Sequence, residues 1–185
     1  TKEDLARLVP GSELNSAVCH LGTETNFPTL EKQRSSIEKL PFNPSKTNYL
    51  LHVGSAAWYK NRKAVYKAFR NATEKLPNLN LKLILVGPKP QDGELDAGLS
   101  DWFQANPNAL ICLNDICENS LGKLYKHARC LVFPSHIEGF GWPPLEAAVY
   151  GCPVITTRTG AISDLLGKYP HYIDADVQTS IDQAV

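Results

Sequence analysis

The sequence predicts an α/β domain in which helices cover both faces of a parallel sheet. From residue 47 onward, short apolar runs alternate with stretches whose apolar residues recur every three or four positions, as in amphipathic helices. The short runs are apolar throughout, which is typical of strands that are buried on both sides. This alternation of strand and helix favours a doubly wound sheet.

Six strands are expected, at residues 48–53, 81–86, 109–113, 131–133, 154–156 and 171–173. The first helix is predicted from Val65, Phe69, Ala72 and Leu76, which are spaced by four, three and four positions. Similar patterns predict further helices at residues 95–103, 121–128, 145–150, 162–166 and from 179 onward. Because crossovers between parallel strands are right-handed, the strand C-termini should share one edge, where the ligand crevice of such folds lies.

Two of these helices have start signals of their own. Asp115 and Glu118 are three residues apart and resemble a capping box before the third helix. Pro144 fits the first position of the fourth helix, since proline there loses no helical hydrogen bond.

The first 46 residues differ from the rest. They contain a short helical pattern at 2–9, a strand-like run at 17–21, and a tract rich in Ser, Thr, Asn and Pro. We therefore expect 1–46 to be the end of a preceding domain with its linker, and 47–185 to be a ligand-binding domain. The absence of any Met and an end inside an apparent helix predict truncation at both ends.

Composition excludes several classes of protein. Nineteen Lys and Arg balance nineteen Asp and Glu, so no general electrostatic argument favours nucleic acid or an anionic membrane. No apolar run is long enough to cross a bilayer. The five cysteines include no C-x-x-C pair, which favours a reducing compartment, and hence the cytoplasm, without disulfides or a zinc site.

The turn after the first strand concentrates positive charge. Gly54 ends the strand, and Lys60, Arg62 and Lys63 follow within ten residues, as a helix begins. Amide groups at a helix start favour anions, and cations strengthen that preference, so a diphosphate would fit here. The alternative interpretation is a solvated first turn, and the position at a strand end favours the diphosphate. Trp58 could contact a ligand, but covering a hydrophobic edge is the favoured interpretation.

The turn after the fourth strand combines glycines with two carboxylates. A glycine stands on each side of Phe140, which lets backbone amides approach a ligand closely. Glu138 and Glu146 are eight residues apart and could accept hydrogen bonds from an extended, hydroxyl-rich ligand. A tight turn followed by a helix-start acid is the alternative. His136, two residues before Glu138, is given a supporting role at most.

The turn after the fifth strand, at residues 156–162, is rich in hydroxyl groups and includes Thr159. It fits either the same crevice or a helix cap. Together the three turns resemble the retaining family 4 glycosyltransferases, which have the GT-B fold and the pattern P-S-x-x-E-G-F-G-x-P-x-L-E-A followed by G-x-P-V-I. The matching residues are Pro134, Ser135, Glu138, Gly139, Phe140, Gly141, Pro143, Leu145, Glu146 and Ala147, then Gly151, Pro153, Val154 and Ile155.

The resemblance implies a Rossmann-like C-terminal domain of a two-domain hexosyltransferase. Such an enzyme moves a sugar from a nucleotide diphosphate to an acceptor (a glycan, a lipid or a small molecule) with retention of configuration. The N-terminal acceptor domain would lie outside this chain, which alone should be inactive. The full-length protein could sit at the inner face of the membrane. Neither a metal ion nor a cofactor is expected.

The resemblance also assigns roles to individual residues. Glu138 would act at the anomeric end of the donor sugar, and Lys60 would hold the diphosphate and stabilise its developing charge. Glu146 would bind the ribose hydroxyls. The other donor-binding positions would be Gly54, Arg62, Gly139, Phe140, Gly141 and Thr159. The base, the sugar and the choice between a front-face path and a covalent intermediate stay open.

Two other functions make different demands on the sequence. A nucleotide-sugar binding module without catalysis fits the same residues, because the acceptor half is not in this chain. A dinucleotide-binding oxidoreductase would need G-x-G-x-x-G after the first strand, and residues 54–59 do not supply it.

Overall fold

The computed structural model describes residues 40–185, so the patterns expected at 2–9 and 17–21, and most of the expected linker, lie outside the described residues. The strands are β1 (Tyr49–Val53), β2 (Lys82–Val86), β3 (Leu110–Leu113), β4 (Cys130–Phe133), β5 (Val154–Thr156) and β6 (His171–Tyr172). The helices are α2 (Arg62–Lys75), α3 (Ala97–Ala105), α4 (Glu118–His127), α5 (Trp142–Val149), α6 (Ile162–Leu166) and α7 (Gln178–Ala184). Short 3-10 turns are η3 (Pro44–Lys46), η4 (Trp58–Lys60) and η5 (Pro77–Leu79).

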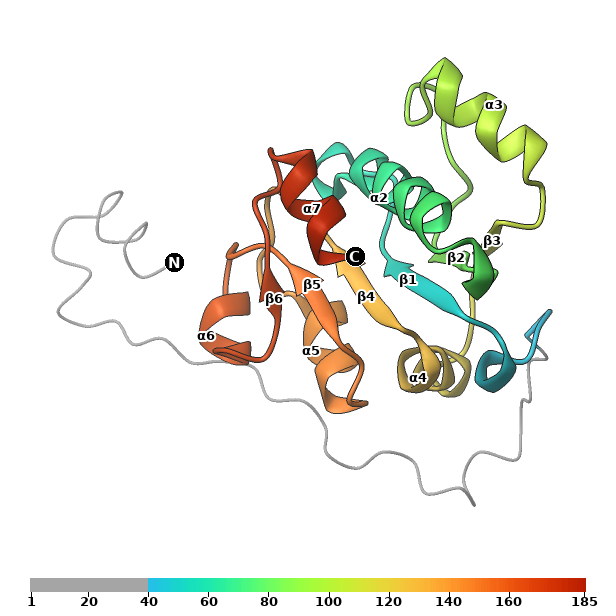
Figure 1. Cartoon of the computed structure of the whole chain (residues 1–185). Coiled ribbons are helices and arrows are strands. Elements are labelled where there is room, and N and C mark those ends of the chain that lie inside the picture. Colours follow the sequence, from blue (N-terminus) through green and yellow to red (C-terminus); the bar gives the residue numbers. More distant parts are fainter. Residues whose placement is uncertain (1–39) are drawn as a thin grey trace, which may run out of the picture. The chain divides into compact units, whose positions relative to one another are not determined.

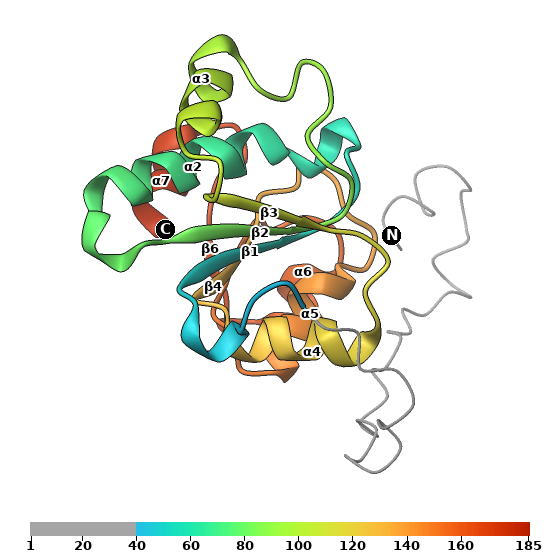
Figure 2. The same cartoon turned by 90° about the vertical axis from the view of Figure 1, so that its right-hand side faces the viewer.

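The six strands form one parallel sheet in the order β3-β2-β1-β4-β5-β6. In this part of the chain, α2, α3 and α7 cover one face and α4, α5 and α6 the other (Figures 1 and 2). The predicted doubly wound α/β fold is confirmed. The chain winds outward from β1 to β3 and then returns to place β4 beside β1. The direction of winding therefore reverses between β1 and β4, which is where such sheets bind ligands.

A hydrophobic core lies on each face of the sheet. Within β1, Leu50 packs with Val65 and Phe69 of α2, while Leu51 belongs to the core under α4. Consecutive β1 residues thus point to opposite faces, and both faces are buried. Apolar runs without alternation are the expected result of this two-sided burial.

Two helix starts differ from the prediction. α4 begins at Glu118 with Cys117 as its N-cap, and Asp115 has a φ of 51°, so the predicted capping box is wrong. α5 begins at Trp142, which puts Pro143 and Pro144 at its second and third positions rather than Pro144 at the first. Prolines are accommodated there because amides of the first turn have no partner within the helix.

Candidate functional site

The loops that follow β1 and β4 meet at the reversal of winding. Lys60 Nζ lies 2.7 Å from Glu138 Oε1, although the two residues are 78 positions apart. The His136 amide donates to the Tyr59 carbonyl at 2.8 Å and ties the two backbones together. The ammonium also lies 4.9 Å from the ring centroid of Phe133, within range of a cation–π contact. The structure thus brings the two predicted catalytic residues together.

The position of Lys60 depends on the left-handed backbone of the next residue, Asn61. Lys60 ends η4, and Asn61 follows with φ 51° and ψ 42° before α2 begins. Asparagine tolerates this region better than most residues, and here its side-chain amide donates to the Ala175 carbonyl at 2.9 Å. The chain thus turns sharply into α2 immediately after Lys60.

Arg62 lies two residues beyond Lys60 but has a different environment. Its side chain is buried, with Nη2 donating to the Tyr66 hydroxyl at 2.7 Å and to the Pro88 carbonyl at 2.8 Å. Nε lies 3.3 Å from Glu94 Oε1. These contacts tie α2 to the loop between β2 and α3, so Arg62 does not pair with Glu138 beside Lys60.

The glycines after β4 leave backbone donors at the start of α5. Within residues 40–185, the amides of Gly139, Phe140 and Gly141 donate no hydrogen bond. Gly141 has a φ of +83°, and a Cβ there would lie 2.5 Å from Ile162 Cγ1, so only glycine fits. Free amides at a helix start favour an anion. Gly54 lies nearby: a Cβ there would be 3.6 Å from Lys60 Cδ.

Glu146, on α5, is held by a hydrogen bond from the neighbouring helix α4. Its Oε2 accepts a hydrogen bond of 2.9 Å from the Tyr125 hydroxyl on α4. Tyr125 is buried, and burial and the Glu146 carboxylate raise its pKa well above the usual range, so the hydroxyl stays a donor. One carboxylate oxygen is thereby fixed by Tyr125.

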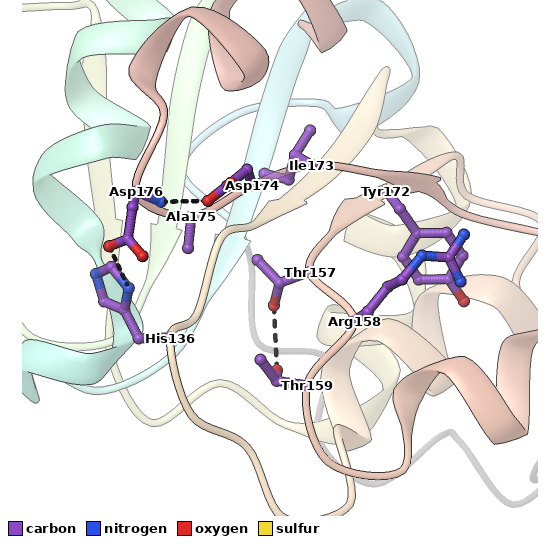
Figure 3. Close-up of a pocket in the computed structure, with 9 residues that line it drawn as sticks. All are labelled: His136, Thr157, Arg158, Thr159, Tyr172, Ile173, Asp174, Ala175 and Asp176. Atoms are coloured by element: carbon purple, nitrogen blue, oxygen red, sulfur yellow. Dashed lines mark hydrogen bonds and ion pairs between the residues drawn. The ribbon is translucent and has the colours of Figure 1, made fainter.

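The turn after β5 contacts the turn after β4. The Ala161 amide donates to the Gly139 carbonyl at 3.0 Å, and the Thr157 hydroxyl donates to the Ser135 carbonyl at 2.7 Å. The hydroxyl oxygens of Thr157 and Thr159 lie 3.1 Å apart. Thr159 also lines a cavity of about 450 Å³ (Figure 3). The next residue, Gly160, packs against the backbone of Glu138 and Gly139, so Thr159 belongs to a turn that contacts the loop of Glu138.

His52 is a buried member of this region. Its Nδ1 lies 2.9 Å from the Val132 carbonyl and its ring stacks on Phe133, while Nε2 has no hydrogen-bond partner among residues 40–185. Burial, together with the positive charges of Arg62 and Lys60, lowers the pKa of His52 to about 4. The ring is therefore neutral near pH 7, with Nδ1 donating to the carbonyl.

This pKa predicts a loss of stability in acid. Because the unfolded chain takes up a proton near pH 6.5 and the folded chain only near pH 4, the stabilising contribution is complete above pH 6.5 and falls as the pH drops toward 4. At pH 5 the loss from this residue should be about 2 kcal/mol. Urea unfolding at pH 7.5 and pH 5 measures it, and His52→Gln should flatten the difference. An unchanged pH dependence in that variant would contradict the assignment.

Comparison with known proteins identifies the family. Residues 33–175 match the family described as "Glycosyl transferases group 1". The chain belongs to this family. The predicted resemblance to glycosyltransferases is thereby confirmed. Within residues 40–185, none of the helices is long and apolar enough to span a membrane.

Individual relatives agree with the family. The chain is 29% identical to the O-antigen chain mannosyltransferase RfbU of Salmonella typhimurium over 153 residues, which cover 82% of this chain and 42% of the relative. It is 32% identical to the uncharacterized glycosyltransferase MJ1059 of Methanocaldococcus jannaschii over 155 residues, 77% of this chain and 35% of the relative. The chain thus spans less than half the length of each.

Solved structures share the fold. WaaG, a glycosyltransferase involved in lipopolysaccharide biosynthesis, superposes with a TM-score of 0.61 at 23% identity, covering 80% of this chain and 42% of WaaG. The C-terminal domain of the group 1 protein LpcC from Francisella tularensis gives a TM-score of 0.60 at 22% identity, covering 74% and 73%. These similarities support the Rossmann-like fold of a GT-B glycosyltransferase domain.

Proposed function

We propose that this chain is the donor-binding part of a glycosyltransferase that transfers a sugar from a nucleotide diphosphate to an acceptor with retention of configuration. The contact between Lys60 and Glu138 at the reversal of winding carries the proposal. It places a cation and a carboxylate where doubly wound sheets bind ligands, next to three amides that donate to no acceptor within residues 40–185. A diphosphate needs the cation and the amides, and a sugar offers hydroxyls to the carboxylate.

In the proposed mechanism, the bond between the anomeric carbon and the diphosphate oxygen breaks, and the diphosphate leaves with the electron pair. The acceptor oxygen ends up bonded to that carbon and its proton passes to the leaving diphosphate or to water, so negative charge grows on the diphosphate during the transfer. The amides of residues 139–141 are already oriented for that charge, and fixed donors stabilise a transition state with little reorganisation. Lys60 moves from Glu138 to the phosphate, and the released carboxylate faces the sugar. Glu146, oriented by Tyr125, accepts hydrogen bonds from the ribose. The positive charge comes from the protein, so the proposal includes neither metal nor cofactor.

The rest of the proposal concerns the whole protein. Since the chain covers 42% and 35% of its two relatives, we place an N-terminal acceptor domain outside it and expect the chain alone to be inactive. The acceptor is a glycan, a lipid or a small molecule. The cysteine pattern favours the cytoplasm. A peripheral place at the inner membrane face is compatible with this proposal for the full-length protein.

Replacing Glu146 with Ala tests the ribose assignment. We expect UDP, GDP or ADP, whichever binds, and the matching nucleoside to lose affinity about equally, by roughly tenfold, because one charged hydrogen-bond acceptor is removed. Calorimetric titration of the 185-residue chain measures both ligands. Glu118→Ala, which removes an exposed carboxylate from the start of α4, is the control. Unchanged nucleoside affinity in Glu146→Ala would contradict the assignment.

A transfer assay on the full-length protein separates the enzyme from the alternative, a binding module without catalysis. Transfer that disappears with Glu138→Gln supports catalysis by this site. Tight nucleotide-sugar binding without transfer to any acceptor or to water would favour the binding module.

A further inference from the structure

The cavity that Thr159 lines is walled mostly by residues to which the proposed donor site gives no role. Its walls come from three segments: His136 after β4, residues 157–159 after β5, and residues 172–176 from β6 and the loop that leads to α7 (Figure 3). Of these, only Thr159 belongs to the predicted donor site. At about 450 Å³, the cavity has the size of small-molecule sites in proteins.

The charges of the cavity favour a neutral, hydroxyl-rich ligand. Asp174 Oδ1 accepts from the Asp176 amide at 2.9 Å, while Oδ2 accepts no hydrogen bond from any residue between 40 and 185. Asp176 lies 3.4 Å from His136 Nδ1, with 85% of its side chain exposed. Arg158 stacks on the Tyr172 ring at 3.8 Å and is the fixed cation of the wall. Two carboxylates against one guanidinium repel a phosphate but accept hydrogen bonds from hydroxyls.

An exposed aromatic ring extends one wall of the cavity. Trp58 is 73% exposed, and its ring stacks on that of His136 with centroids 6.2 Å apart and planes 28° apart. Most of the indole is therefore open to contact from outside this part of the chain. A sugar ring has an apolar C–H face and a rim of hydroxyls. It can therefore pack on the indole while the rim reaches the carboxylates.

The cavity adjoins the place of transfer. His136 stands two residues before Glu138, and its amide is bonded to the carbonyl that precedes Lys60. On the other wall, Gly160 follows Thr159 and packs directly against the backbone of Glu138 and Gly139. A ligand in the cavity would thus lie next to the loop that carries Glu138.

We propose that this cavity and Trp58 bind a neutral hexose unit of the acceptor, which makes the acceptor a glycan. The proposal rests on the proposed function, since an acceptor subsite has meaning only beside a donor site. A subsite of this kind holds the acceptor chain next to the transferred sugar. It also gives the donor domain a part in choosing the acceptor.

Binding of simple glycosides tests the inference. The probes are methyl α-D-mannopyranoside and methyl α-D-glucopyranoside, followed by saturation-transfer NMR and tryptophan fluorescence on the 185-residue chain. For ligands of this size we expect Kd values in the millimolar range. Trp58→Ala should weaken binding at least fivefold, Asp174→Asn about threefold, and Trp58→Phe less than Trp58→Ala because it keeps an aromatic face. Asp92→Asn, an exposed aspartate between β2 and α3, should have no effect.

Nucleotide binding in the same samples keeps the two proposals apart. Trp58→Ala should bind UDP, GDP or ADP as the unchanged chain does, which also shows that the variant is folded. Absence of glycoside binding, or equal glycoside binding by the unchanged chain and Trp58→Ala, would overturn the acceptor subsite while nucleotide binding persists. Failure of every nucleotide to bind would instead count against the proposed donor site.

Discussion

Replacing Lys60 with Ala is expected to weaken binding of a nucleoside diphosphate by about 10- to 100-fold while leaving the nucleoside almost unchanged. A charged hydrogen bond contributes about 1.5–3 kcal/mol, and the phosphate would lose its cation. In the full-length enzyme, the loss of one oriented group that stabilises developing charge should lower kcat by about 100-fold or more. Calorimetry on this chain and rate measurements on the full-length protein check the two parts.

Lys63 provides a matched control for Lys60. It lies three residues further along, on α2, is 46% exposed, and contacts Asp96 at 3.6 Å. Its contact is a surface ion pair, which contributes little, so Lys63→Ala should leave the affinity unchanged. Equal losses in the two variants would mean that overall charge, rather than the position of Lys60, governs the affinity.

Replacing Gly160 with Ala is expected to destabilise the chain by about 3 kcal/mol or more and to abolish donor binding. Gly160 has a φ of +59°, and a Cβ there would lie 2.3 Å from the Glu138 carbonyl oxygen and 2.4 Å from that of Gly139. The left-handed conformation costs about 1–2 kcal/mol for alanine, and the overpacking adds about 1–3 kcal/mol. The atoms that must move belong to the loop of Glu138, so binding should fall with stability.

Gly151 separates the two causes of that loss. It has a φ of +72°, but a Cβ there would meet nothing within 4 Å. Gly151→Ala should therefore show the conformational cost alone, about 1–2 kcal/mol, with nucleotide affinity retained. Urea unfolding and nucleotide titration of both variants test this. Similar behaviour of the two variants would refute the steric role of Gly160.

Much of the fold could be predicted because buried segments have a recognisable pattern of apolar residues. β1, β2, β4 and β5 are covered on both faces, so their residues are apolar throughout, and each expected strand lies within about a residue of the observed one. Helix starts were less predictable. The capping box at Asp115 failed because the backbone there is left-handed, which an Asp–x–x–Glu spacing does not reveal.

The candidate site could be predicted from the sequence only in part. Glu138 and the glycines around Phe140 form a contiguous motif, and their spacing identified the loop. Lys60 and Arg62 look equivalent in sequence, yet one meets Glu138 and the other is buried against Tyr66 and Glu94. The difference arises because Arg62 is already on α2, one turn before Tyr66, whereas Lys60 lies before the left-handed Asn61.

The sequence by itself determined the parallel α/β class, the order of its elements and the loops that carry the chemistry, because these depend on local patterns of burial and backbone freedom. The tertiary structure decided which of those loops meet. It paired Lys60 with Glu138 and set Trp58 on His136 beside two carboxylates from the loop after β6. Such contacts depend on strand order, and strand order follows from how the whole chain packs rather than from any one segment.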